Sequence, residues 1–485
     1  MINWRVISKV LGTLLWLEGA FLLLCVLMAF LYHEDDVMAF LMSALASCAA
    51  AVILTAAGSE AANTMSRREA FLVVTLAWVM FSAFGMLPFL IFGSLTSVTD
   101  AYFEAMSGFS TTGATLIAQV EHLPHGLLFW RSLTQWIGGL GIVFFTIAIL
   151  PSMTGGSVKV FAAEATGPMR SRIHPKLSTG AKWIWSVYLL LTLLCALSFW
   201  LCGMSGFDAA CYSMSTTATG GFTPQDDGLT SFHSPSMEYV SILFLFLSGV
   251  NFTLLYMALF RRRFSALLHS DELRFYTLTL LACSGIVGTV LVSTCHYDVE
   301  HAVRSSLFHV VSMLTTTGVM TEDIGQWPRI TWLLLALCGV VGASAGSTTG
   351  GLKSMRCLMM VKQMQAELRR MLHPNAVMPV RIDRQPVPSD KMSQLSTFFV
   401  LNMALLFFAT AVMVLSGIDL VNSVQIAISL IANVGAPLST DVGPSMSWAD
   451  LPVITKWTAT LLMLMGRLEV MTVLVIFTRE FWRKR

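Results

Sequence analysis

Long apolar stretches dominate this chain and limit what it can fold into. A membrane-spanning helix needs about 20 predominantly apolar residues. We expect transmembrane helices at ten such stretches, near residues 9–32, 37–58, 69–93, 125–150, 181–203, 237–260, 274–295, 329–350, 393–417 and 452–478. Charged residues make up only 12% of the 485 residues, against roughly 25% in soluble domains. The sequence therefore predicts an all-α polytopic membrane protein with ten transmembrane helices.

The charge and the cysteines exclude several other classes. A formal net charge of +2 provides no basic surface for nucleic acid. Of the nine cysteines, Cys25, Cys195 and Cys338 are examples that lie within apolar stretches. Cysteines in such surroundings behave as small buried hydrophobic residues. We therefore expect no disulfide framework and no zinc site.

The basic residues predict the orientation in the membrane. Cytoplasmic loops carry an excess of Lys and Arg. With the N-terminus in the cytoplasm, 25 of the 30 basic residues fall on that side, while Arg467 lies within a stretch and only four lie outside: Arg131, Arg304, Arg329 and Lys456. We expect both termini to be cytoplasmic.

Four segments on the outer side share one pattern. They read DAYFEAMSGFSTTGAT (100–115), FDAACYSMSTTATGGFT (207–223), VRSSLFHVVSMLTTTGVMTED (303–323) and VNSVQIAISLIANVGAPLSTD (421–441). Each is long enough for a short helix but too short to cross the membrane, and each lies between two apolar stretches. Each then breaks at a glycine, and the four are Gly113, Gly220, Gly318 and Gly435. The chain therefore contains four copies of span, short helix, glycine loop and span.

Four parallel copies of this unit predict a ring around an axis along the membrane normal. A backbone that stops partway across a membrane is tolerated where it lines a polar cavity, and rings of backbone carbonyls select potassium in known pores. Glycine allows the left-handed backbone that inward-pointing carbonyls need, and Thr111, Thr112, Thr219, Thr316 and Thr317 could add hydroxyl oxygens. The alternative is that each glycine only ends a short helix.

The eighth stretch is interrupted by small and polar residues, GVVGASAGSTTGGLKSMR from Gly339 to Arg356. Such a composition makes a poor helix interior, so we expect a loop inside the membrane, beneath the third glycine, where a gate would lie. Close helix packing through small residues is the alternative. Gly342 to Gly346 also matches G-x-S-x-G, but a nucleophile elbow needs a strand before it, and none is predicted.

Arg467 and Glu469 lie within the tenth stretch, where charged residues are costly and usually functional. Arg467 could hydrogen-bond carbonyls of the broken eighth stretch or repel cations from the axis. A structural ion pair with Glu469 or a snorkelling side chain is the alternative. We assign Asn251, in the sixth stretch, to helix packing.

Several motifs resemble a known family over essentially the whole chain. They are SGFSTTGAT (107–115), RSLTQWIGGLG (131–141), TATGGFT (217–223), TTTGVMTED (315–323), GSTTGGLKSMR (346–356), HPNAV (373–377) and GRLEV (466–470). They resemble the Trk-type membrane subunits of the Trk/Ktr/HKT superfamily of potassium transporters. The extra N-terminal helix pair favours the Trk type over the Ktr type.

The resemblance implies a homodimer in the bacterial inner membrane, with one pore in each protomer and potassium as the transported ion. It implies a loop that obstructs the pore below the filter, and a cytosolic RCK-type regulatory subunit, TrkA-like, that binds NAD(H) and/or ATP/ADP. No nucleotide site is expected on this chain, because it lacks a G-x-G-x-x-G motif after a strand. The long basic segment 353–392 is the expected docking site for that subunit.

The expected ion ligands combine the pattern and the resemblance: Thr111, Thr112, Gly113, Thr219, Gly220, Gly221, Thr317, Gly318, Val319, Asn433, Val434, Gly435 and Ala436. The expected gating residues are Gly346, Ser347, Thr348, Thr349, Gly350, Gly351 and Arg467. The fourth segment, NVGAP, lacks threonine and carries Pro437, so it departs from the pattern of the other three.

The expected architecture has five parts around a pseudo-fourfold pore: an N-terminal helix pair (1–66), pore repeat one (67–178), pore repeat two (179–270), pore repeat three with the gating loop (271–390) and pore repeat four (391–485). The expected function is potassium uptake through a gated, selective pore. The alternative is a sodium- or proton-coupled symporter, although such carriers commonly use inverted repeats and midplane carboxylates. No catalytic constellation predicts an enzyme.

Overall fold

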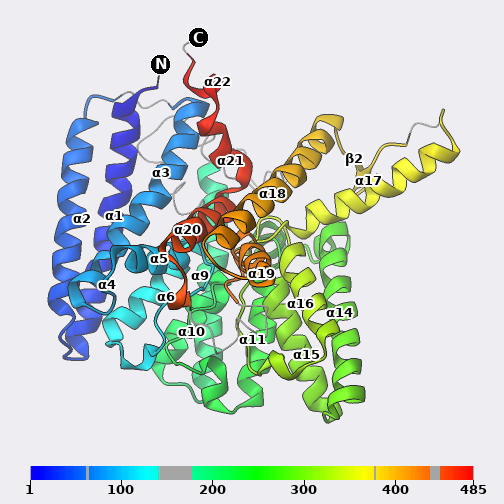
Figure 1. Cartoon of the computed structure of the whole chain (residues 1–485), viewed down its shortest axis with the longest axis horizontal. Coiled ribbons are helices and arrows are strands. Elements are labelled where there is room, and N and C mark those ends of the chain that lie inside the picture. The colour runs from blue at the N-terminus through cyan, green and yellow to red at the C-terminus, as the bar shows by residue number, and fades with distance from the viewer. Residues whose placement is uncertain are drawn as a thin grey trace.

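The computed structural model describes residues 2–61, 65–139, 141, 177–375, 378–436 and 448–483. Most of the basic loop 151–180 lies outside the described residues, and so does Pro437 of the fourth segment. In the part that the structure describes, helices account for nearly all regular structure (Figure 1).

The longer helices are α1 (Trp4–Leu31), α2 (Val37–Ala57), α3 (Arg67–Gly85), α5 (Val98–Phe109), α6 (His125–Gly139), α9 (Leu177–Leu201), α10 (Gly206–Ala218), α11 (Pro235–Ser248), α14 (Asp271–Cys295), α15 (Val299–Leu314), α16 (Arg329–Val341), α17 (Ser354–Leu372), α18 (Ser389–Leu415), α19 (Leu420–Ile431) and α20 (Val453–Leu468). The short helices are α4 (Leu87–Phe92), α12 (Phe252–Leu259), α13 (Ser265–Leu268), α21 (Val470–Leu474) and α22 (Arg479–Trp482), and the strands are β1 (Arg381–Ile382) and β2 (Gln385–Pro386).

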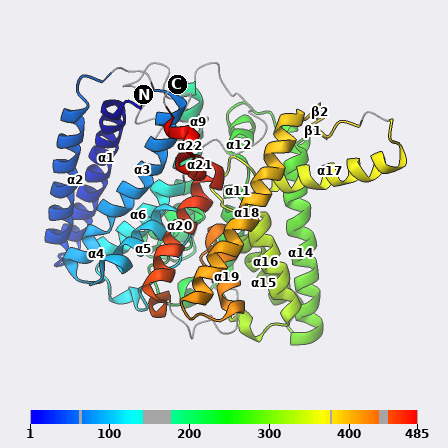
Figure 2. The same ribbon diagram turned by 45° about the horizontal axis from the view of Figure 1, so that its top comes forward.

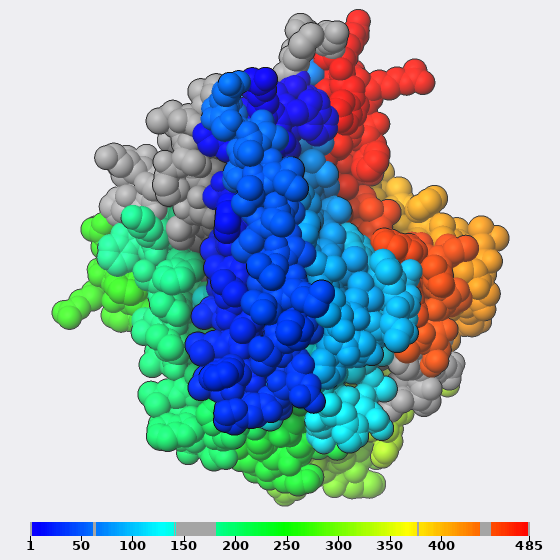
Figure 3. All heavy atoms as spheres, turned by 90° about the vertical axis from the view of Figure 1, so that its left-hand side faces the viewer, coloured from blue at the N-terminus to red at the C-terminus, as the bar shows by residue number. Residues whose placement is uncertain are grey.

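The N-terminal helices α1 and α2 form a closely packed pair. A methyl group at Gly12 would lie 2.7 Å from Thr55 Cγ2, and one at Gly19 would lie 2.7 Å from Cys48 Sγ. Small residues allow membrane helices to approach in this way. The pair covers the middle of one face of the molecule (Figure 3), and α1 also packs against α3 and α6.

Six helices among the described residues are long and apolar enough to cross a membrane, and the number is eight if each of two bent helix pairs is counted as one span. The six are α1, α2, α3 with α4, α9 from Ala181, α14 and α18. These eight elements correspond to eight of the ten expected spans, so this part of the prediction is confirmed in number and position. The chain is therefore a multi-pass membrane protein.

Four of the ten expected spans differ from continuous helices. The stretch 237–260 is bent by 102° between α11 and α12, and the stretch 452–478 is bent by 110° after α20. Each of these two stretches therefore consists of two helical pieces joined at a bend, where we expected one helix. In the stretch 329–350, only the 13-residue α16 is helical. Of 125–150, the described part is α6 and residue 141. A two-stranded ladder of β1 and β2 also departs from the expected all-α fold.

Four short helices lie between the long ones: α5, α10, α15 and α19. In Figure 1 they lie among the longer helices, α5 packs against α3, α6 and α20, and α10 packs against α6 and α9. Both chain termini lie at the same end of the molecule.

The segment after the broken eighth stretch leaves the helix bundle. Helix α17 begins against α14 and α18, then projects away from them (Figure 2). Lys362 Nζ lies 2.7 Å from Asp271 Oδ2 and 2.9 Å from the Arg381 carbonyl, so the middle of α17 is tied to both α14 and β1. The far end of α17 exposes Met364, Leu368 and Met371.

Candidate functional site

The four short helices all end in the same hydrogen-bonded motif. In α5, Thr111 N–H donates to Gly108 O and Thr112 N–H donates to Ser107 O, both at 3.0 Å. This pair of bonds defines a Schellman motif, with Thr111 as its left-handed residue at φ +55°. The corresponding left-handed residues of α10, α15 and α19 are Thr219, Thr316 and Asn433, at φ +54°, +57° and +55°.

The motif answers the question of whether the glycines merely cap helices. Threonine or asparagine supplies the left-handed residue of each cap, although these residues adopt positive φ less readily than glycine. The glycines come two positions later and have positive φ of their own: Gly113 (+82°), Gly221 (+88°), Gly318 (+72°) and Gly435 (+71°). Each therefore serves a purpose other than ending the helix.

That purpose is a close approach between neighbouring segments. A methyl group at Gly113 would lie 2.1 Å from Gly220 O, and one at Gly221 would lie 2.2 Å from Thr317 O. A methyl group at Gly318 would lie 2.1 Å from Val434 O, and one at Gly435 would lie 2.0 Å from Thr112 O. The contacts run from segment one to two, three, four and back to one, so the four segments form a closed cycle. We call the carbonyl groups of Thr112, Gly220, Thr317 and Val434 the carbonyl ring.

The structure corrects the glycine matching in the second segment. The sequence pattern pairs Gly220 with Gly113, but Gly221 has the positive φ and the close contact with the next segment. Gly220 instead occupies the place of Thr112, because its carbonyl belongs to the ring. The two adjacent glycines are indistinguishable by composition, so the pattern alone selected the wrong one.

A second correction concerns Val319 and Ala436, which we expected to be ion ligands. The Val319 carbonyl accepts a 2.6 Å hydrogen bond from Ser312 Oγ, and the Ala436 carbonyl accepts a 2.9 Å bond from Ser429 Oγ. Both serines are on the short helix of their own repeat. These two carbonyl groups are therefore directed toward the helices and not toward the ring.

The fourth segment keeps the backbone of the other three despite its different sequence. Asn433 takes the place of threonine and adds two contacts, because its Nδ2 donates to Thr112 Oγ1 at 2.9 Å and to Met463 O at 3.0 Å. The amide thus connects segment four to segment one. Over residues 433–436, the fourth segment therefore differs from the other three in its side chains and not in its backbone conformation.

Two buried charged residues behind the first segment were not identified from the sequence as site residues. Arg131 on α6 and Glu104 on α5 are 2% and 1% exposed, and Arg131 Nε lies 3.1 Å from Glu104 Oε1. Glu104 also accepts from Leu116 N–H at 2.9 Å, and Arg131 donates to Thr223 O at 3.3 Å. The pair therefore connects the chain just after segment one, at Leu116, to the end of segment two, at Thr223. Neighbouring Gln135 accepts from Phe222 N–H at 3.1 Å.

The interruption in the eighth stretch lies directly against the ends of the short helices. Helix α16 continues to Val341, so the loop comprises residues 342–353 and is shorter than the expected range from Gly339. Thr348 Oγ1 donates to Thr217 O at 3.0 Å, and Gly350 N–H donates to Thr316 Oγ1 at 2.7 Å. Gly351 N–H donates to Ala432 O at 2.9 Å. The loop thus contacts the ends of α10, α15 and α19.

Arg467 connects this loop to α6. Its guanidinium donates to Thr348 O at 2.7 Å, to Gly138 O at 2.6 Å and to Gly139 O at 2.9 Å. The expected hydrogen bond between Arg467 and a loop carbonyl is therefore present. Glu469 pairs with Arg356 at the start of α17. The chain bends at Glu469, where φ is +67°.

Other residues hold the loop from its two sides. Asn251, which we had assigned to helix packing, caps α12 and donates from Nδ2 to Ala345 O at 2.7 Å. Glu272 at the start of α14 accepts from Ala345 N–H at 2.5 Å. Lys353 is 6% exposed, and its Nζ donates to Thr349 O. The contacts of Asn251 and Glu272 join residues far apart in sequence, so no local pattern indicates them, whereas Lys353 bonds a residue four positions earlier in the same loop.

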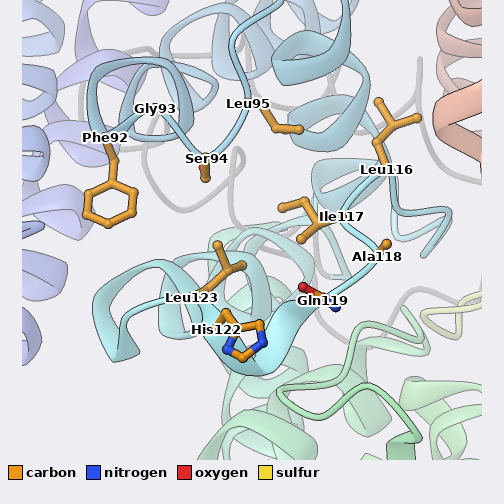
Figure 4. A pocket seen from close by; sticks show the side chains of 10 residues that line it. All are labelled: Phe92, Gly93, Ser94, Leu95, Leu116, Ile117, Ala118, Gln119, His122 and Leu123. Atoms are coloured by element: carbon orange, nitrogen blue, oxygen red, sulfur yellow. The ribbon is translucent and has the colours of Figure 1, made fainter.

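Two other candidate sites are separate from the ring. Ser344 of the G-x-S-x-G match follows helix α16, not a strand, so it lacks the context of a nucleophile elbow. A shallow pocket of about 490 Å³ is lined by residues 92–95 and 116–119 together with His122 and Leu123 (Figure 4). Within the described ranges, no group of three or more His, Cys, Asp or Glu side chains could hold a metal ion.

Long apolar helices around four polar, mutually contacting backbone segments define a membrane protein of the ion-transporting class. Comparison with known proteins agrees. A family model described as TrkH, cation transport protein, matches residues 36–484. The Trk system potassium uptake protein TrkH of Halomonas elongata is 35% identical over 483 residues, covering 99% of each chain. TrkG of Escherichia coli is 32% identical, covering 99% of each chain.

A solved structure gives the same result for the fold. The crystal structure of the potassium transporter TrkH from Vibrio parahaemolyticus matches with a TM-score of 0.90 and 30% identity, covering 99% of this chain and 100% of that one. The chain therefore belongs to the TrkH family of cation transport proteins. The relatives named here are transporters and not enzymes.

Proposed function

We propose that this chain takes up potassium through a selective, gated pore whose filter is the carbonyl ring. The observation that carries the proposal is the closed cycle of contacts among the four segments, in which each glycine lies against a ring carbonyl of the next. The printed names of the relatives, potassium uptake and potassium transporter, support potassium as the transported ion.

The ligand chemistry supports the same proposal. Four backbone carbonyls, of Thr112, Gly220, Thr317 and Val434, would replace part of the hydration shell of a potassium ion. Thr111, Thr219 and Asn433 each directly precede a ring residue along the chain, and Thr219 Oγ1 lies 3.5 Å from Thr348 Oγ1 of the loop. Neutral oxygen ligands suit a monovalent ion that must leave as readily as it binds.

Residues 342–353 would form the gate, and the hydrogen bonds of Arg467 would hold the gate closed. The loop contacts the ends of three short helices, and Arg467 connects it to α6. A loop in this place obstructs the path below the ring as long as these bonds persist. Gly346, Gly350 and Gly351 provide the backbone freedom for the loop to move, and Ser347 and Thr349 are the other proposed gating residues beside Thr348.

The proposed architecture has ten membrane crossings, of which eight belong to a pseudo-fourfold arrangement of four repeats and two form the N-terminal pair. Stretch 125–150 and the broken stretch 329–350 supply the two crossings beyond the eight that helix length and composition support. The bias of the basic residues supports cytoplasmic termini in a bacterial inner membrane. The five parts would divide at residues 66, 178, 270 and 390.

The proposed partners are a second copy of this chain and a cytosolic nucleotide-binding subunit of the TrkA-like RCK type. The names of the relatives describe them as proteins of a Trk system, and this supports the presence of a further subunit. The projecting α17 and the β1–β2 hairpin, on the cytoplasmic side in the proposed orientation, provide a surface for it. Co-purification of this subunit with a variant lacking residues 373–388 tests the docking site.

Rubidium uptake into cells that lack their own potassium transport tests the proposed function. Cells that express this chain should accumulate rubidium faster than cells with an empty vector, and potassium should compete more strongly than sodium. A sodium- or proton-coupled symporter would instead lose uptake when the sodium gradient or the proton gradient alone is collapsed. No uptake above the empty vector would contradict the proposal.

A further inference from the structure

Four buried serines occupy the same position in the four repeats. Each lies six residues before the positive-φ glycine, and they are Ser107, Ser215, Ser312 and Ser429. Their exposed fractions are between 0% and 3%. The backbone carbonyl of each accepts from the N–H of a ring residue, at 3.0, 3.0, 2.8 and 2.9 Å in segments one to four. Ser215 falls at this position only when the spacing is counted from Gly221 and not from Gly220.

The hydroxyl groups of the third and fourth serines make a second contact, on the far side of the glycine. Ser312 Oγ donates to Val319 O at 2.6 Å, and Ser429 Oγ donates to Ala436 O at 2.9 Å. The hydroxyl must be the donor because a carbonyl oxygen has no proton. Each of these serines therefore holds the chain immediately before and immediately after a ring glycine.

The first two segments are held differently. Ser215 Oγ accepts from Gly221 N–H at 3.1 Å, and the next residue is held by Gln135. Ser107 Oγ is buried without a hydrogen-bond partner, and Glu104 holds the return of segment one through Leu116 N–H. Segment one thus depends on an α5 side chain, and segment two depends on Gln135 of α6 together with the Ser215 hydroxyl as an acceptor. In segments three and four, by contrast, the serine hydroxyl donates to the carbonyl that follows the ring glycine.

We propose that Ser312 and Ser429 are positioning residues that set the ion preference of the carbonyl ring. By directing the carbonyls of Val319 and Ala436 toward the short helices, they fix the peptide planes that flank Gly318 and Gly435. A ring that is fixed on both sides resists contraction around the smaller sodium ion, and cavity size contributes to selectivity in carbonyl filters. The inference rests on the proposed function of the ring and assigns a role to side chains outside it.

Competition between rubidium and sodium during uptake tests this inference. Ser312→Ala and Ser429→Ala each remove one hydroxyl with little change in volume, and the ratio of rubidium to sodium preference should fall about fivefold, the equivalent of one net hydrogen bond. Ser107→Ala is the matched control, because its hydroxyl has no partner to lose. Its ratio should stay within about twofold of the wild type.

The ratio does not depend on how much protein reaches the membrane, so reduced accumulation does not imitate the effect. If Ser312→Ala does not accumulate, Ser429→Ala gives an independent answer. Wild-type ratios in the accumulated variants, or an equal loss in Ser107→Ala, would overturn the inference while leaving the proposed function intact. Absence of rubidium uptake by the wild type would instead overturn the proposed function, and the inference with it.

Discussion

Gly435 and Thr112 close the cycle between the last and the first of the four segments. A methyl group on Gly435 would lie 2.0 Å from the carbonyl oxygen of Thr112 and 2.7 Å from the amide nitrogen of Ala114. Real carbon atoms do not approach a backbone oxygen so closely. The fourth segment, which differs most in sequence, is therefore packed as tightly as the other three.

The first prediction follows from this contact. Gly435→Ala should reduce the preference for potassium over sodium by about tenfold, as much as Gly113→Ala, because overpacking at either position displaces a ring carbonyl. Uptake of rubidium in competition with sodium measures the effect. Gly417→Ala is the control, because Gly417 also has a positive φ, +99°, but nothing lies within 4 Å of the added methyl. A wild-type ratio for Gly435→Ala would contradict the ring at this segment.

The second prediction separates the two glycines of segment two. Gly221→Ala should damage selectivity more than Gly220→Ala. A methyl at Gly221 would meet the Thr317 backbone at 2.2 Å, whereas one at Gly220 would meet the side chain of Gln135 at 2.4 Å. A side chain can move aside more cheaply than backbone. The same competition assay applied to both variants decides the register, and a larger loss in Gly220→Ala would restore the original matching.

The sequence predicted the repeats because apolar length and glycine spacing are local properties. Ten stretches, four short helices and the interruption after α16 all follow from composition over windows of about 20 residues. The left-handed residues Thr111, Thr219, Thr316 and Asn433 could not be predicted in the same way, because threonine seldom adopts positive φ. In the third segment, Thr316 Oγ1 accepts a hydrogen bond from Gly350 N–H, which is a contact between distant parts of the chain.

Contacts between distant elements could not be predicted from the sequence either. The Glu104–Arg131 pair joins two helices, and nothing in the local pattern of either helix indicates the partner. The direction of the Val319 carbonyl depends on one hydroxyl of α15. The bend between α11 and α12 has Asn251 at its end, where its side chain bonds the loop. Periodicity describes which face of a helix is apolar, and it does not describe such bonds.

The third prediction concerns pH and the turn between α1 and α2. Burial and the nearby Glu34 carboxylate raise the pKa of Asp36 to about 6, from an ordinary value of 3.8, while His125 partly offsets this rise. The folded protein therefore binds more protons than the unfolded chain between these values, and its stability falls as the pH rises through this range. A methyl group at Gly126 on α6 would lie 2.2 Å from Asp36 Oδ2, so the carboxylate has little room to escape.

Asp36→Asn should accordingly raise the Tm of the purified protein at pH 7.5 and flatten its dependence on pH between 4 and 6.5. Thermal unfolding in one detergent across this range is the measurement. Asp35→Asn, at an exposed neighbouring carboxylate, is the control and should leave the profile unchanged. The same gain in Tm at pH 4.5 and pH 7.5 would show that the charge of Asp36 is not the cause.

The fourth prediction concerns Arg467 and its hydrogen bonds to the proposed gate. Arg467→Ala removes hydrogen bonds to Thr348 O on the loop and to Gly138 O and Gly139 O on α6. Bonds from charged donors contribute about 1.5–3 kcal/mol each, and gating equilibria shift over about 1–3 kcal/mol. Rubidium uptake without the regulatory subunit should therefore rise about tenfold, and deletion of Gly346 to Thr349 should raise it as well.

Arg467→Lys distinguishes the hydrogen bonds from the charge. Lysine keeps the positive charge but lacks the planar fork that bonds two chains at once. If the bonds hold the loop closed, Arg467→Lys should resemble Arg467→Ala; if the charge repels cations, it should resemble the wild type. Arg479→Ala, at an exposed position in α22, should leave flux unchanged. Wild-type flux in the loop deletion, with the protein inserted and folded, would show that residues 342–353 are not the gate, whatever Arg467 does.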